Sequence, residues 1–202
     1  MEPLVDIHTH NLTATGAVIS VRPWQLKPLP GRVYSVGIHP WDTAGVTPEM
    51  MAELETAAAR EQVVAIGECG VDALRGACVE RQVEIAQAHI RLSKRLGLPL
   101  ILHCVRAVNH IVALYRLNNP SQPWVVHGFR GSAGAAKALL ACRGICLSFG
   151  ERFPEAALAV TPVERILVET DESAMPIESI AARVAAAKGC SPADLAAAKI
   201  FA

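Results

Sequence analysis

The residues best suited to chemistry lie near the start of the chain, in the stretch Asp6-Ile7-His8-Thr9-His10. Alternate side chains of an extended strand share a face, so His8 and His10 should project together while Ile7 and Thr9 point away. Two neighbouring imidazoles at a strand end suit a divalent metal ion. Asp6 falls on the same face, where its carboxylate could orient one ring. Two merely exposed histidines are the alternative, and this pair alone does not decide between them.

Eight short runs of mostly aliphatic residues predict strands, and most of them end in a polar or glycine-containing segment. They cover residues 4–10, 17–21, 33–37, 63–67, 99–103, 124–127, 144–149 and 166–169. Such near-continuous apolar runs are typical of strands that are covered on both faces.

Helical patterns lie between the later strands. Thr47 and Pro48 form a typical helix start, with a capping hydroxyl followed by proline in the first turn. Apolar residues recur at helical spacing over residues 79–90, in a segment that ends at Gly97 before a proline. Similar patterns cover residues 108–117 and 133–142, alanine runs favour helix at 185–187 and 196–198, and a capping box occupies residues 191–194.

Eight strands that alternate with helices predict an α/β fold, a (β/α)8 TIM-type barrel forming a single domain over residues 1–202. The segments 10–17 and 21–33 are too short for an outer helix, and the second contains Pro23, Pro28 and Pro30. We therefore expect a distorted barrel that lacks its first two outer helices. Either the proline-rich segment or a second chain would cover the strands left bare.

Histidine and carboxylate residues gather at the ends of the predicted strands, where chemistry in such barrels is located. In chain order they are His8, His10, His39, Glu68, His103, His127 and Asp171. Each alone could be a core histidine, a helix cap or a salt-bridge partner. Together they suit divalent ions such as zinc, manganese, magnesium or nickel. His89 and His110 fall inside predicted helices, so we expect them at the surface or in a groove.

Charge and composition limit the possible partners. Lysine plus arginine and aspartate plus glutamate number 19 each, so binding to a polyanion must depend on local cations or on metal. The acidic start and the lack of a long apolar run predict neither a secretory signal nor a membrane span. Six cysteines without a CxxC pair are most simply free thiols. We expect a cytoplasmic protein, either monomer or dimer.

Six short motifs follow one another along the chain. They are His8-Thr9-His10, Gly37-Ile38-His39-Pro40, Gly67-Glu68-Cys69-Gly70-Val71-Asp72, His103, His127-Gly128-Phe129-Arg130-Gly131 and Glu169-Thr170-Asp171. In this order they resemble the TatD family of metal-dependent hydrolases, of which the chain would be a shortened variant. The resemblance implies a distorted barrel, a dinuclear metal centre, and deoxyribonuclease or related phosphoesterase activity.

The resemblance also implies a role for each motif residue. The expected ligands are His8, His10 and Asp171 for one ion, and His103 and His127 for the other, with Glu68 bridging the two. His39 matches a position that faces the scissile phosphate. Asp171, beside the water that the two ions would activate, is the expected proton acceptor.

The chain departs from the family pattern where the substrate would bind. The arginine that commonly stands two residues after the histidine at His103 comes one residue later, as Arg106. Cysteine, phenylalanine and serine after His127 are replaced by glycine, phenylalanine and Arg130. We expect both arginines, with His39, to hold the phosphate oxygens of DNA or another phosphodiester. Alternatively, the arginines are surface charges paired with carboxylates.

Two other functions remain compatible with this sequence. One is a hydrolase that uses the same centre on a small phosphate ester, an amide or a lactone. The other is a non-catalytic relative that only binds, against which the complete set of ligand-type residues argues.

Overall fold

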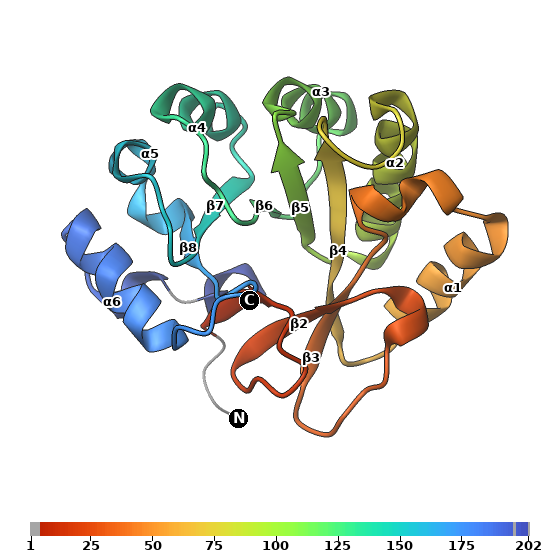
Figure 1. Cartoon of the computed structure of the whole chain (residues 1–202), viewed down its shortest axis with the longest axis horizontal. Helices are drawn as coiled ribbons and strands as arrows, with labels where there is room; N and C mark the ends of the chain where they lie inside the picture. Colours follow the sequence, from red (N-terminus) through yellow and green to blue (C-terminus); the bar gives the residue numbers. More distant parts are fainter. Residues whose placement is uncertain (1–4, 196, 202) are drawn as a thin grey trace.

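The computed structural model describes residues 5–195 and 197–201, and its eight parallel strands form a closed barrel in chain order (Figure 1). The strands are β1 Asp6–Thr9, β2 Ala17–Val21, β3 Val33–Val36, β4 Val63–Asp72, β5 Leu100–Val105, β6 Trp124–Val126, β7 Ile145–Phe149 and β8 Ile166–Val168. Pairing of Asp6 with Val168 joins the last strand to the first. The predicted TIM-type barrel is thus confirmed, although the predicted strand start at Leu4 lies outside the described residues.

The outer helices begin only after the third strand. Within the described residues they are α1 Pro48–Ala58, α2 Val79–Leu96, α3 Val108–Asn118, α4 Ala133–Leu140, α5 Glu155–Val160 and α6 Ile177–Lys188. In Figure 1 they surround the barrel from the right, over the top, to the left, while the lower edge at β2 and β3 has no α-helix. The predicted absence of the first two outer helices is confirmed.

The expected capping residues define the ends of two helices. The Thr47 hydroxyl accepts a hydrogen bond from the backbone N–H of Met50 at the start of α1. Gly97 adopts the left-handed conformation that ends α2. Across residues 5–195 and 197–201, every helix is too short or too polar to cross a lipid bilayer.

The segment between β2 and β3 covers part of the region that lacks helices. It contains the short 3-10 helix η1, Pro23–Gln25, which lies against α1. Pro23 is buried, Leu26 packs against the main hydrophobic core, and the Tyr34 hydroxyl accepts a hydrogen bond from the backbone N–H of Leu29. These contacts agree with the expectation that the proline-rich segment folds back over the strands.

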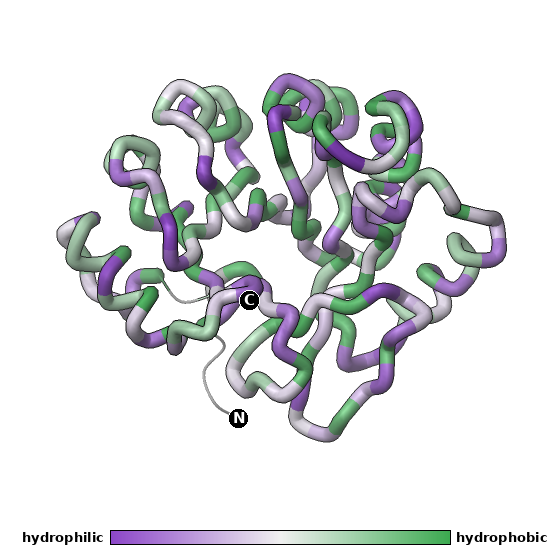
Figure 2. Tube along the Cα trace, in the orientation of Figure 1, coloured by the Kyte–Doolittle hydropathy of each residue, from purple (hydrophilic) through white to green (hydrophobic). Residues whose placement is uncertain are grey.

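A layer of apolar side chains fills the barrel below its mouth. Each strand contributes at least one member: Ile7, Val18, Val33, Ala65, Ile101, Val125, Cys146 and Leu167. Ala197 and Ile200, from the 3-10 helix η5 Ala197–Ile200, pack against this layer. Figure 2 shows hydrophobic (green) stretches through the strand region, interrupted by hydrophilic (purple) segments. The interior is therefore a packed core that leaves only the mouth for a site.

Two local predictions are wrong, and a third is confirmed only in part. Ile7 does not point away from the interior, because the pairing of β1 with β2 shifts register between Asp6 and Thr9. His89 is fully buried, because it follows Ile85 by four residues on the buried face of α2. The capping box at residues 191–194 does form, since the Ser191 N–H donates to Asp194, but it starts a 3-10 turn and no α-helix. His110 is exposed on α3, as expected.

Candidate metal centre

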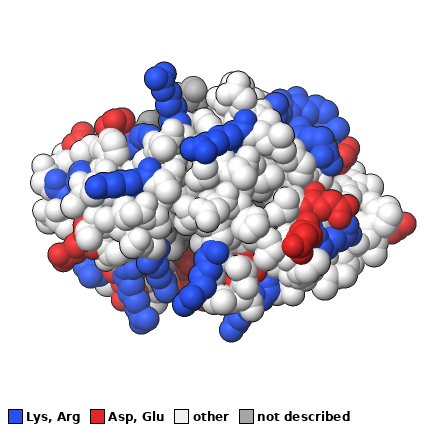
Figure 3. Space-filling model, turned by 90° about the horizontal axis from the view of Figure 1, so that it is seen from above, with Lys and Arg blue, Asp and Glu red and all other residues white. Residues whose placement is uncertain are grey.

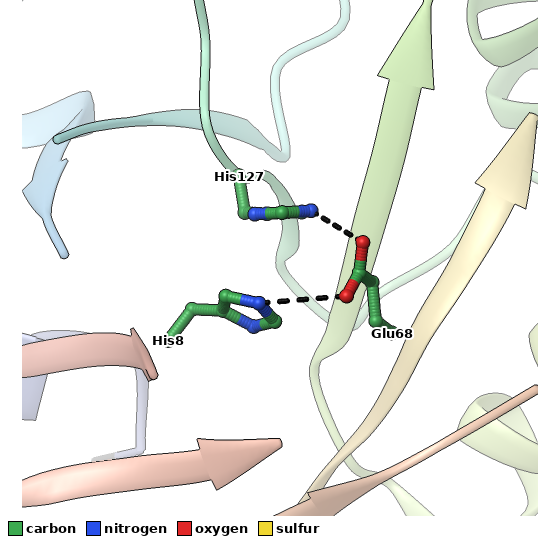
Figure 4. Close-up of side chains that lie close together, drawn as sticks. All are labelled: His8, Glu68 and His127. Atoms are coloured by element: carbon green, nitrogen blue, oxygen red, sulfur yellow. Dashed lines mark hydrogen bonds and ion pairs between the residues drawn. The ribbon is translucent and has the colours of Figure 1, made fainter. Parts of the chain in front are cut away.

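Glu68 lies at the centre of a polar cluster in the barrel mouth (Figure 4). Its Oε1 atom is 2.7 Å from Nε2 of His127, 2.8 Å from Nδ1 of His103 and 3.0 Å from Nε2 of His39. Burial acts to raise the pKa of Glu68, but His127, His10 and His103 outweigh it and hold that pKa well below its usual range. Glu68 is therefore a buried carboxylate in its charged form.

The other oxygen of Glu68 faces the two histidines of the first motif. Oε2 is 3.5 Å from Nε2 of His8 and 3.5 Å from Nε2 of His10. Oδ1 of Asp171 lies 3.8 Å and 3.7 Å from the same two nitrogens. His8, His10 and Asp171 offer ligand atoms within 4.8 Å of one another, so the residues expected to share one ion are brought together.

The second expected group also meets at Glu68, but with additional neighbours. His103 and His127 both contact Oε1, and the His127 ring also lies beside that of His8, with ring centroids 4.1 Å apart. Ligand atoms of His39, Glu68 and His103 lie within 4.8 Å of one another, as do those of His8, Glu68 and His127. A bridging position for Glu68 fits these distances. His39, expected only to face the substrate, lies among the possible ligands as well.

Irregular backbone directs Glu68 into the mouth. β4 was expected to end at Gly67 but continues to Asp72, and its register with β5 shifts between Ile66 and Cys69. A bulge of this kind re-aims a side chain without ending the strand. Gly70 has a φ of 131°, and an added Cβ there would overlap the backbone oxygen of β5. Only glycine allows this close approach of the two strands.

His8 provides the test of whether the cluster fits a metal ion. Its ring is fully buried, and neither ring nitrogen has a hydrogen-bond partner among the described residues. Leaving such groups without a partner costs about 1–3 kcal/mol each. Burial, with the neighbouring His127, holds the pKa of His8 well below its usual value, so the ring is neutral and able to ligate. Imidazole nitrogens and carboxylate oxygens together fit a divalent metal.

Glu169 is a buried carboxylate behind the cluster that sequence reasoning missed as a functional residue. Its Oε1 accepts a hydrogen bond of 2.6 Å from the Gly128 N–H and lies 3.5 Å from Nδ1 of His127. Burial acts to lower the pKa of His127, but Glu68 and Glu169 raise it well above its usual value. The sequence did offer a signal, since Glu169 closes the last predicted strand within the final motif.

Asp6 does not orient an imidazole, contrary to the expectation from strand alternation. Its carboxylate accepts hydrogen bonds from the backbone N–H of His8 at 3.2 Å and from the N–H and hydroxyl of Thr170 at 3.1 Å and 2.7 Å. Burial raises the pKa of Asp6 to about 7. Asp6 therefore ties β1 to the segment that carries Asp171.

The two candidate arginines lie on loops at the edge of the cluster. Arg106 and Arg130 are exposed, and with His103, His127 and Asp171 they line a cavity of about 590 Å³. Within the described part of the chain, neither arginine has a carboxylate within 4.0 Å. The alternative that these arginines are paired with carboxylates is therefore wrong for the described residues. Both residues line a cavity that also reaches His103, His127 and Asp171.

Elsewhere on the surface, charges of both signs are mixed. Figure 3 shows blue and red side chains interspersed on one face, without a continuous basic patch. This agrees with the equal numbers of acidic and basic residues in the sequence. On that face, attraction for a polyanion has no broad electrostatic source.

The sequence profile described as TatD related DNase matches residues 18–198. The chain belongs to this family. It is 34% identical over 180 residues to the 3'-5' ssDNA/RNA exonuclease TatD of Pantoea sp. (strain At-9b), covering 79% of this chain and 66% of the relative. It is also 34% identical over 154 residues to the uncharacterized metal-dependent hydrolase TatD of Mycobacterium tuberculosis, covering 69% of this chain and 58% of the relative. The chain thus spans less than two thirds of the length of these relatives.

Solved structures of TatD proteins share the fold of this family member. The TatD homologue YJJV from Escherichia coli K12 superposes with a TM-score of 0.78 at 19% identity, covering 95% of this chain and 92% of the other. A TatD family hydrolase from Entamoeba histolytica gives a TM-score of 0.74 at 17% identity, covering 94% and 93%. At these identities the comparison establishes the distorted barrel alone.

Proposed function

We propose that this TatD family chain is a metal-dependent phosphodiesterase that cleaves nucleic acid with the help of two divalent ions. The observation that carries the proposal is the buried ring of His8, whose nitrogens have no hydrogen-bond partner among the described residues although Oε2 of Glu68 lies 3.5 Å from Nε2. Relatives named as 3'-5' ssDNA/RNA exonucleases support a single-stranded polynucleotide as the substrate class.

We assign the residues to two ligand groups. His8, His10 and Asp171 would hold one ion, and His103 and His127 the other, with Glu68 between them; the proximity of His8, His10 and Asp171 to one another, and of Glu68 to His103 and His127, supports this assignment. Bound divalent ions lower the pKa of a water molecule and offset negative charge on phosphoryl oxygens.

The other steps depend on the side chains at the mouth. Asp171 is 30% exposed, so its carboxylate can reach both the cluster and the solvent, and it accepts the proton of the attacking water. His39 is 12% exposed and lies at Oε1 of Glu68. Its ring faces the scissile phosphate. Arg106 and Arg130, which line the cavity of about 590 Å³, bind the phosphate oxygens that point away from the cluster.

The test is metal content and hydrolysis measured on one preparation. Protein purified without chelator should contain up to two divalent ions per chain and should shorten single-stranded DNA when manganese or magnesium is added. Glu68→Gln should lose metal and activity together, because it removes the charge shared by both ligand groups. Glu53→Gln, on the exposed face of α1, is the matched control and should keep both.

A lactone and a small phosphate ester serve as competing substrates in the same assay. Preferential hydrolysis of either over DNA would refute the proposed substrate class, and a chain without bound metal would refute the mechanism. Cytoplasmic location stays a prediction of the sequence.

A further inference from the structure

Trp41 is an exposed aromatic side chain at the edge of the candidate metal centre. It lies in the 3-10 helix η2, Pro40–Gly45, which begins four residues after the end of β3, and lines a cavity of about 370 Å³ that is also lined by Glu68. Its side chain is 47% exposed, whereas Trp124 is fully buried. A half-exposed indole beside the cluster leaves aromatic surface available to a ligand.

Hydrogen bonds hold Trp41 in one orientation. The indole Nε1–H donates to Oδ2 of Asp72 at 2.7 Å, and the backbone N–H donates to Nδ1 of His39 at 3.1 Å. The indole centroid is 4.7 Å from the ring of His39 and 6.2 Å from that of His103. The ring is therefore fixed in place next to candidate ligands, which lowers the entropic cost of binding a flat partner.

The positively charged guanidinium of Arg75 lies over the indole ring of Trp41. The Arg75 guanidinium carbon is 4.7 Å from the ring centroid of Trp41. The loop that carries Arg75 is held by the buried Gln82, whose Nε2 donates to the backbone oxygens of Asp72, Arg75 and Ala77 at 3.0, 2.7 and 2.8 Å. Arg75 is thus presented by an ordered loop, and its guanidinium lies over the indole ring of Trp41, which itself lines the cavity.

We propose that Trp41 and Arg75 form a nucleotide subsite beside the metal centre. The base next to the scissile bond stacks on the indole face that Arg75 does not cover, and the guanidinium binds the adjoining phosphate. An aromatic ring paired with a cation is the combination that binds single-stranded nucleic acid without sequence preference. The subsite rests on the proposed phosphodiesterase function and deepens it, because it selects a polynucleotide over a small ester.

Equilibrium binding separates stacking from catalysis. The probes are labelled oligothymidylate and an abasic oligomer of equal length, measured by fluorescence anisotropy with the protein as purified. Base stacking contributes about 1–3 kcal/mol, so Trp41→Ala should weaken oligothymidylate binding by about tenfold or more while abasic binding changes little. Trp41→Phe should restore most of the difference. Trp24→Ala is the matched control, since Trp24 is 38% exposed on η1 and does not line this cavity.

The charge is tested separately by salt titration. Arg75→Gln should weaken binding of both oligomers. It should also reduce the slope of log Kd against log salt by about one, which corresponds to the loss of one phosphate contact. Arg143→Gln, exposed before β7 at the opposite end of the barrel, should leave that dependence unchanged. If Trp41→Ala does not fold, Trp41→Leu, which keeps an apolar side chain but has no aromatic ring, takes its place with the same expected loss of oligothymidylate binding.

Two results would overturn the subsite. One is equal weakening of oligothymidylate and abasic binding by Trp41→Ala. The other is loss of metal content in that variant, which would show that Trp41 acts on the cluster through Asp72. If Trp41→Ala and Arg75→Gln bind and hydrolyse DNA as well as the wild type does, the subsite is refuted but the proposed phosphodiesterase function is not. If binding depends on the base and on Trp41 but the protein hydrolyses no phosphodiester, the subsite is supported and the proposed function is refuted.

Discussion

Replacement of His89 by glutamine tests how far the stability of the barrel depends on one buried neutral imidazole. Nε2 of His89 accepts a hydrogen bond of 2.9 Å from the Ile38 N–H, and Nδ1 lies 2.8 Å from the Ile85 oxygen. The ring thereby ties α2 to the chain just before His39. Burial lowers the pKa of His89 from 6.5 to about 4, although the bond to Ile85 acts in the opposite direction.

The sign of the effect follows from proton counting. Between pH 6.5 and about pH 4 the unfolded chain carries a proton on His89 that the folded chain does not. The free energy of unfolding therefore rises with pH in this interval. The contribution of the neutral His89 ring to the free energy of unfolding is fully present above pH 6.5 and is lost as pH falls toward 4. At about 1.4 kcal/mol per pH unit the full loss is about 3 kcal/mol, a large part of the stability of a small protein.

Urea unfolding at about pH 7.5 and about pH 4.5 measures this difference. Wild type should lose about 2–3 kcal/mol more than His89→Gln over that interval, because glutamine can accept the bond from Ile38 but does not titrate. Other groups titrate in both proteins and cancel in the comparison. His110→Gln, exposed on α3, should keep the wild-type dependence. Equal slopes for wild type and His89→Gln would refute the argument that burial keeps this ring neutral.

Three further outcomes follow from the structure. His103→Ala should lower metal content by about one ion, since the other ligand group is left intact; elemental analysis showing no metal at all would contradict two separable groups. Glu169→Gln should weaken metal binding by about 10–100-fold, because it removes the negative charge that lies 3.5 Å from Nδ1 of His127; calorimetric titration with zinc measures this, and unchanged affinity would exclude the role. Gly37→Ala should destabilise by about 3 kcal/mol, because a Cβ there would overlap the backbone of β4, whereas Gly45→Ala, with open space around it, should be neutral in thermal unfolding; equal effects would contradict the close contact.

The positions of most site residues could be predicted from the sequence because parallel strands bring their carboxyl ends to one edge. His8, His103 and His127 end or follow apolar runs, and no knowledge of side-chain packing was needed to place them at the same mouth. The helix ends at Thr47 and Gly97 followed from local chemistry in the same way. These features depend on residues that are neighbours in the sequence.

Features that depend on distant contacts were the ones missed. His89 lies on the apolar face of α2, but its burial is stabilised by the Ile38 N–H from another part of the chain. Glu169 was assigned only to a strand end, and its role emerges from contacts with Gly128 and His127. A hydrogen-bond partner 41 residues away leaves no trace in the local pattern.

The register of β1 shows why strict alternation fails at the site itself. In a regular strand Ile7 and His8 would face opposite sides, so one of them would leave the barrel. The shift between Asp6 and Thr9 lets Ile7 pack in the interior layer while His8 reaches Glu68. β4 has a similar shift around Glu68. His8 and Glu68 therefore both lie where the sheet is irregular. In a regular strand, adjacent residues face opposite sides, so one cannot fill the core while the next supplies a ligand.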